Sequence, residues 1–175
     1  ALAAARRAQE EADAAAHPNH LLGARLARAE EERARGNAAA RGGRWAAAKG
    51  HYDQAFVHVY TTEEDWARRV APADRERLLA LRRVLYLNRA QCRLKLGHPA
   101  ADALWDCDQA LKLGGPAEAR AKGHYRRARV WLARLEREAF ARAAAGAFWD
   151  PDKARRWLAE AEGGLAAAAA AAGEG

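Results

Sequence analysis

The sequence lacks several residue types, and each shortage excludes a class of protein. Serine, isoleucine and methionine do not occur among the 175 residues, and threonine occurs only as Thr61 and Thr62. The lack of serine excludes a serine nucleophile. Because β-branched residues favour strands, their scarcity excludes a sheet-based fold. Two cysteines are too few for a disulfide framework, which points to a reducing compartment, the cytoplasm or the nucleus.

Long apolar runs are also missing. No stretch approaches the roughly 20 apolar residues that a membrane-spanning helix needs, and residues 166–172 form an alanine tail. The first residues carry Glu10, Glu11 and Asp13 among their arginines and have no leucine-rich segment, so no export signal is predicted. We therefore expect no membrane partner.

The charge is positive but mixed. Lys and Arg number 30 against 23 Asp and Glu, which gives a net charge of +7. A basic surplus attracts nucleic acid, but acidic runs at 30–32 and 63–65 interrupt the basic residues. This interleaving is typical of a solvated helical surface, so nucleic acid is a disfavoured partner.

The residues that are abundant favour helices. Alanine makes up more than a quarter of the chain, so thin helix-on-helix packing is favoured over one thick core. Five prolines, at positions 18, 72, 99, 116 and 151, mark helix starts or ends. Between them apolar residues recur every three or four positions. The clearest stripe is Leu78, Leu81, Leu85, Ala90 and Leu94, in a helix that ends at Gly97. The sequence therefore predicts a single all-α domain.

A helical-hairpin pattern occurs three times. Aligning three small residues, Gly36, Ala90 and Ala128, brings the three units into register. Small residues let the helices of neighbouring hairpins approach closely, and three units suffice to bury a continuous core. The pattern predicts hairpins at 31–60, 83–114 and 117–150, a long joint at 61–82, a leading helix or linker at 1–30, and a capping helix with an alanine-rich tail at 151–175.

Three motifs carry a family resemblance. GNAAARGGRWAAAKGHYDQA, LYLNRAQCRLKLGHPAADALWDCDQAL and KGHYRRA, with the long joint TTEEDWARRVAPADRER, resemble the tetratricopeptide domain of co-chaperones that dock on heat-shock protein 90 or 70. The most similar group is the C-terminal domain of large immunophilins, of the FK506-binding-protein and cyclophilin 40 type. The resemblance covers residues 30–165 and implies three hairpins in a right-handed superhelix plus a C-terminal capping helix. The missing initiator methionine suggests a fragment or a processed chain, and if the parent protein resembles a large immunophilin, a peptidyl-prolyl isomerase domain would precede Ala1.

The resemblance further implies a binding site for an acidic peptide. In the family, five side chains form a clamp for the two carboxylates at the end of a peptide such as EEVD. The matching residues are Arg33, Asn37, Asn88, Lys122 and Arg126, with arginine replacing the usual first lysine. Residues four apart on a helix share a face, so cationic and amide donors would line one groove. The resemblance also implies that Gln91, Leu94 and Lys95 contact the peptide upstream of its C-terminal residue.

Other side-chain patterns predict no chemistry. Cys92 and Cys107 occupy packing positions of one hairpin and are expected to be buried free thiols. His51 and His58 do not have metal-ligand spacing, and there is no glycine-rich phosphate loop. We expect no metal, no cofactor and no catalytic residue.

The sequence thus predicts an adaptor that binds the C-terminal peptide of heat-shock protein 90 or 70, and not an enzyme. Two other functions stay open. One is a scaffold subunit whose groove is filled by a neighbour's helix. The other is a helical-repeat protein that binds RNA through its positive charge.

Overall fold

The computed structural model describes residues 22–68, 70–148 and 150–173, and this part of the chain is helical apart from its turns. The helices are α2 (Leu22–Arg41), α3 (Trp45–Val59), α4 (Glu63–Arg68), α5 (Pro72–Leu96), α6 (Ala100–Lys112), α7 (Ala117–Ala144) and α8 (Pro151–Gly173). No strand occurs among these residues, so the predicted all-α class is confirmed.

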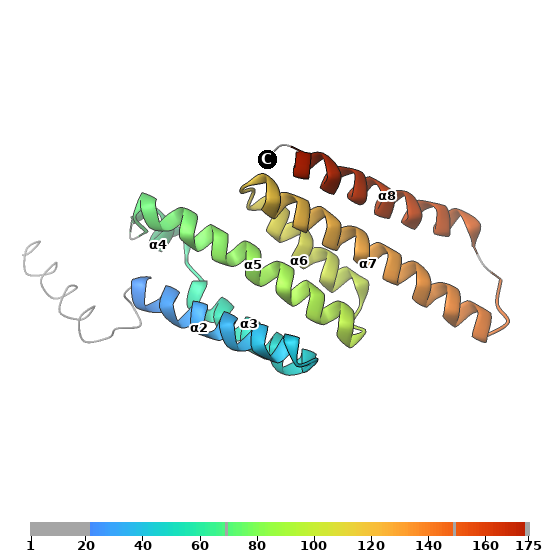
Figure 1. Cartoon of the computed structure of the whole chain (residues 1–175), viewed down its shortest axis with the longest axis horizontal. Coiled ribbons are helices and arrows are strands. Elements are labelled where there is room, and N and C mark those ends of the chain that lie inside the picture. Colours follow the sequence, from blue (N-terminus) through green and yellow to red (C-terminus); the bar gives the residue numbers. More distant parts are fainter. Residues whose placement is uncertain (1–21, 69, 149, 174–175) are drawn as a thin grey trace, which may run out of the picture.

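The long helices pack in consecutive pairs (Figure 1). α2 packs on α3, α5 on α6, and α7 on α8, while contacts of α3 with α5 and of α6 with α7 join each pair to the next. α2, α5 and α7 run side by side, with α3 and α6 behind them. Side chains from α2, α5 and α7 therefore share one face of the protein.

Prolines and glycines stand at the helix ends, as the sequence predicts. Gly97 ends α5 in the left-handed conformation with φ 77°, and its N–H donates to the carbonyl oxygen of Leu94 at 3.3 Å. Glycine adopts this conformation without the clash that a Cβ atom would cause. Prolines stand at the start of four helices, namely Pro72, Pro99, Pro116 and Pro151.

Two predicted boundaries differ from the structure. The first helix begins at Leu22, so residues 22–30, predicted to be a leader outside the hairpin, form one helix with 31–41. Leu26 and Ala29 are buried against the same core as the rest of α2, which explains why the helix extends to include them. The predicted joint at 61–82 contains α4 and the first turns of α5. The buried Leu78, where the apolar stripe of α5 begins, thus lies inside the range predicted as the joint. Residues 1–21 lie outside the described residues.

The prediction for the third hairpin is wrong. Residues 117–144 form one continuous helix, α7, in place of the two helices expected within 117–150. No proline occurs inside this stretch, and no glycine lies between Gly123 and Gly146, so nothing interrupts a run of alanine, arginine, leucine and glutamate. α8 then packs along α7 as the second helix of that pair, where the sequence predicted a separate capping helix.

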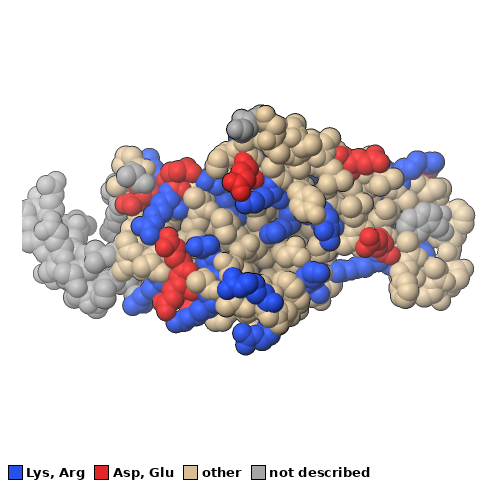
Figure 2. Space-filling model, viewed as in Figure 1, with Lys and Arg blue, Asp and Glu red and all other residues tan. Residues whose placement is uncertain are grey.

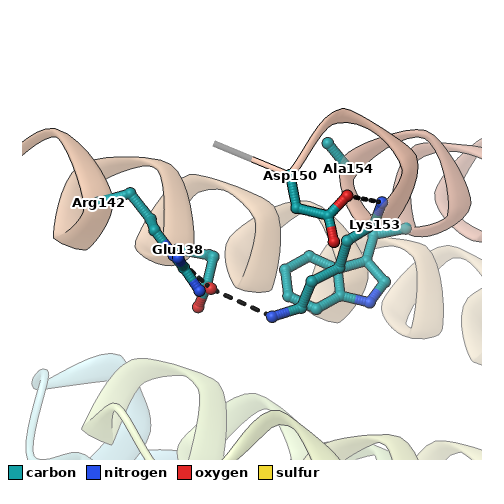
Figure 3. Close-up of a pocket in the computed structure, with 6 residues that line it drawn as sticks. Glu138, Arg142, Asp150, Lys153 and Ala154 are labelled. Carbon is teal, nitrogen blue, oxygen red and sulfur yellow. Dashed lines mark hydrogen bonds and ion pairs between the residues drawn. The ribbon is translucent and has the colours of Figure 1, made fainter. Parts of the chain in front are cut away.

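The turn before α8 is stabilised by local contacts (Figure 3). Asp150 caps the helix because its Oδ1 accepts hydrogen bonds from the backbone N–H groups of Asp152 and Lys153 at 3.0 and 3.1 Å. The Lys153 ammonium pairs with the Glu138 carboxylate of α7 at 3.1 Å. The cavity between these side chains has only about 10 Å³ of space and is therefore closed to ligands.

The core is thin and divided, as the alanine content suggests. A larger cluster joins α2, α3 and α5, and includes Leu26, Tyr52 and Leu85. A smaller cluster joins Ala90, Ala103, Cys107 and Val130 of α5, α6 and α7. The larger cluster fixes α2 against α5, on whose shared face the candidate site lies.

The three small residues aligned in the sequence occupy close helix contacts. Gly36 is buried where α2 crosses Tyr52 of α3, and a Cβ atom there would lie 2.5 Å from the ring. Ala90 and Ala128 are both fully buried, and Ala128 lies against Gly164 of α8. Small side chains thus allow the close approach that the repeat pattern predicts.

Candidate functional site

An open hollow of about 230 Å³ lies on the face shared by α2, α5 and α7, and we refer to it as the inner hollow. Its lining contains four of the eight predicted site residues, Asn37, Asn88, Gln91 and Arg126. The described residues that line it are Asn37, Ala40, Arg41, Trp45, Tyr52, Asn88, Gln91, Cys92 and Arg126. It comes from four helices, since Trp45 and Tyr52 belong to α3.

The two asparagines are joined by a hydrogen-bond network at the hollow. Asn37 Oδ1 accepts one hydrogen bond from the Tyr52 hydroxyl at 2.8 Å and one from Asn88 Nδ2 at 3.1 Å. This arrangement directs the oxygen of Asn37 toward protein donors. No hydrogen bond occupies the amide N–H₂ of Asn37 within the described ranges, so it remains available to an acceptor on a ligand.

The charges of three arginines act on the Tyr52 hydroxyl. Burial raises the pKa of Tyr52 to about 12, and the charges of Arg126, Arg33 and Arg41 act in the opposite direction. Burial also lowers the pKa of Arg126, whose guanidinium donates to the carbonyl oxygen of Leu87. Guanidinium groups stay charged in proteins, so a positive potential is held near this hydroxyl.

Arg33 is not part of the lining of the inner hollow, although its charge acts on Tyr52, which is. Arg33 is half-buried, and its Nε atom is buried without a hydrogen-bond acceptor among the residues described. A buried donor without a partner costs about 1 to 3 kcal/mol.

The other predicted site residues lie outside the lining. Lys122 is exposed on α7 and pairs with Glu118 at 2.6 Å. The ammonium of Lys95 lies 5.9 Å from the centre of the Trp45 ring, at the edge of the hollow. Leu94 packs against the smaller core cluster, and the structure places it in the packing between helices.

The four cations at or near the inner hollow share the absence of a carboxylate partner among the described residues. Within the described part of the chain, no carboxylate pairs with Arg33, Arg41, Lys95 or Arg126. The lining of the inner hollow contains no Asp or Glu.

Cations elsewhere are commonly paired. Arg89 and Arg93 both bind Asp106, and Arg127 binds Asp108 and Glu160. Figure 2 shows basic side chains across the middle of the face that α2, α5 and α7 share. The inner hollow is therefore suited to an anionic ligand.

Sequence reasoning missed Arg41 as a site residue, although a signal for it existed. Arg33, Asn37 and Arg41 are spaced four residues apart on α2, so a single stripe holds all three. Trp45 and Tyr52 belong to the packing of the larger core cluster, and both also line the hollow. A side chain at the edge of a thin core can both pack between helices and line a surface hollow.

Residues that support other chemistry are not gathered at this site. The described residues contain no group of three or more His, Cys, Asp and Glu side chains that could hold a metal ion. Cys92 and Cys107 are free and buried, and burial raises the pKa of their thiols to about 11 and about 12. None of the helices in the ranges described is both long and apolar enough to cross a membrane.

Comparison with family models and with curated proteins finds no match to this chain.

Proposed function

We propose that this chain is an adaptor that binds the acidic C-terminal peptide of heat-shock protein 90 or 70, in the cytoplasm or nucleus, and that it has no catalytic activity of its own. The observation that carries the proposal is the set of donors around the inner hollow. Arginines and asparagine amides converge there, and no carboxylate among the described residues pairs with these arginines. The three helix pairs, with small residues at their contacts, support a tetratricopeptide superhelix as the fold.

The size of the inner hollow suits the end of a peptide. A space of about 230 Å³ is smaller than the roughly 300 to 1,000 Å³ of most small-molecule pockets. One terminal residue with two carboxylates fits such a space. Its α-carboxylate would accept hydrogen bonds from the Asn37 and Asn88 amides and from Arg126, and its side-chain carboxylate would meet Arg33. Charge-assisted hydrogen bonds of this kind are the strongest in proteins.

Lys122 and Lys95 would contribute less than Arg126. Lys122 is exposed and must leave Glu118 to reach a ligand, so a competing ion pair reduces its contribution. Lys95 lies beside Trp45, where it would meet an acidic side chain upstream of the peptide end. Gln91 lines the hollow between these two regions and would bond the peptide backbone.

The test is calorimetric titration of the chain with the peptide MEEVD and with the same peptide amidated at its C-terminus. Binding of MEEVD that disappears on amidation supports carboxylate capture. Arg126→Ala is expected to weaken binding by about 1.5 to 3 kcal/mol, the range for hydrogen bonds to charged groups. Arg129→Ala is the matched control, because Arg129 lies on the same helix, is exposed and bonds only the Tyr125 hydroxyl.

Three results contradict the proposal. They are equal affinity for both peptides, no binding of either, and equal weakening by Arg126→Ala and Arg129→Ala. Failure of both peptides, together with a tightly bound partner that resists high salt, would favour the scaffold function instead. Glu118→Gln provides an independent check, because releasing Lys122 should strengthen MEEVD binding.

A further inference from the structure

We propose that a second groove, between α7 and α8, binds an acidic peptide segment through its side-chain carboxylates. This α7–α8 groove has about 870 Å³ of space, which lies within the size range of ligand-binding clefts. It is open to solvent along both helices. The residues that carry the argument are Arg127, Trp131 and Arg134 of α7, and Arg156, Trp157 and Glu160 of α8.

Arg134, Arg156 and Trp131 contribute donors of the groove that lack a hydrogen-bond or ion-pair partner among the described residues, and His124, whose imidazole can donate and accept, lacks one as well. Arg134 makes no hydrogen bond or ion pair with any described residue, and its guanidinium lies 5.3 Å from the Trp131 ring centre and 4.2 Å from that of Trp157. The Trp131 indole N–H is buried without an acceptor. Arg156 is exposed and acts on the Asp150 carboxylate only through its charge.

The carboxylate and the remaining cations of the groove are already used. Glu160 pairs with Arg127 at 3.0 Å, and Arg127 also binds Asp108 of α6 at 3.0 Å. Lys153 is held by Glu138 at the end of the groove (Figure 3). A ligand entering the groove therefore meets unused donors and no unused carboxylate, which is complementary to an anion.

The indole rings favour a peptide over a nucleic acid. A base stacks on an open ring face, but cations already cover the Trp157 ring, with Arg134 at 4.2 Å and Lys153 at 4.8 Å from its centre. Trp157 is only 8% exposed. Recognition by stacking is thus blocked, whereas the guanidinium forks of Arg134 and Arg156 remain able to bind carboxylates.

The groove is separate from the inner hollow. The two share no lining residue. The groove residues of α7 recur at positions 124, 127, 131 and 134, which form one stripe of the helix, and Arg126 lies on a different stripe. Binding at one site can therefore be measured without the other.

The test uses hexaglutamate that is acetylated at its N-terminus and amidated at its C-terminus, titrated calorimetrically into the full chain. This probe has no terminal carboxylate for the inner hollow. Arg134→Ala and Arg156→Ala are each expected to weaken binding about fivefold or more, as loss of a charge-assisted contact does at a partly exposed site. Arg129→Ala removes the same charge from another stripe of α7 and is expected to change affinity less than about twofold.

Two further variants make the test specific. Trp131→Phe keeps an aromatic ring and deletes the unpaired N–H, so it should also weaken hexaglutamate binding. Arg126→Ala should leave it unchanged, which separates this proposal from the one for the inner hollow. Because Arg156 is exposed, its substitution tests the groove without disturbing the packing of α7 on α8.

Any of three outcomes overturns the proposal. The first is no binding of hexaglutamate to the unsubstituted chain. The second is equal weakening by Arg134→Ala, Arg156→Ala and Arg129→Ala, which would show only general attraction to a positive surface. The third is displacement of hexaglutamate from the groove by a short oligothymidylate that binds more tightly, which would show a nucleic-acid site.

Discussion

Substitution of Gly36 by alanine tests whether the contact of α2 with α3 controls both stability and the inner hollow. A methyl group on Gly36 would lie 2.5 Å from Cε1 and 2.8 Å from Cδ1 of Tyr52. The Tyr52 side chain is only 2% exposed, so moving the ring away from the added methyl group disturbs its packing in the larger core cluster. Overpacking of this kind costs about 1 to 3 kcal/mol, and the better helix propensity of alanine offsets about 1 kcal/mol. Because the contact is severe, we expect a net loss of about 1 to 2 kcal/mol.

Gly50→Ala is the matched control for this substitution. Gly50 lies within α3, and a methyl group there meets nothing within 4 Å. The same exchange should therefore stabilise the protein by up to about 1 kcal/mol. Urea unfolding followed by circular dichroism measures both free energies. Equal stability of the two variants would refute the reasoning.

The same variant should also weaken peptide binding. The Tyr52 hydroxyl holds Asn37 in place through its hydrogen bond to Oδ1, so displacing the ring disturbs the amide that faces the ligand. Titration with MEEVD should show lower affinity for Gly36→Ala and unchanged affinity for Gly50→Ala. Lower stability with unaltered affinity would show that the ring does not position the site.

Three further predictions concern the buried polar groups. Asp106→Ala should cost about 3 to 5 kcal/mol in urea unfolding, since it removes the buried carboxylate that pairs with both Arg89 at 2.7 Å and Arg93 at 2.9 Å and leaves Arg89 only its ion pair with the partly exposed Asp53; a loss under 1 kcal/mol would argue against a structural role. With pKa values of about 11 and about 12, the thiols of Cys92 and Cys107 should resist iodoacetamide at pH 8 until the protein unfolds, and mass spectrometry would detect any early labelling. Burial raises the pKa of Tyr52 from 10 to about 12, so its contribution to stability is full below pH 10 and is lost as the pH rises through 12. Tyr52→Phe should reduce that alkaline loss, and an identical pH profile for this variant would contradict the assignment.

Much of the secondary structure follows from local sequence. The apolar stripe from Leu78 and the glycine at position 97 correctly predicted α5 through its end, because side-chain spacing and backbone freedom act within a few residues. The same reasoning failed for residues 117–150, where the expected repeat implied a turn that the residues themselves do not specify. An uninterrupted run of helix formers outweighed the repeat pattern there.

The site was predicted only in part, for a related reason. Asn37 and Arg126 could be placed on helix faces from the sequence, since the helical period is fixed. Which of these faces meet depends on how closely and at what angle the helices cross. That geometry brings Arg41 into the inner hollow, turns Leu94 into the packing and leaves Lys122 outside with Glu118.

The sequence by itself thus determined the all-α class, most helix ends and the close contacts at Gly36, Ala90 and Ala128. Each depends on the properties of one residue or on the period of one helix. The tertiary structure alone decided that α8 completes the α7 pair, and that Arg126 at the inner hollow and Arg134 in the α7–α8 groove have no carboxylate partner among the described residues. Pairing of charges between helices depends on distances across the fold, which no local pattern encodes.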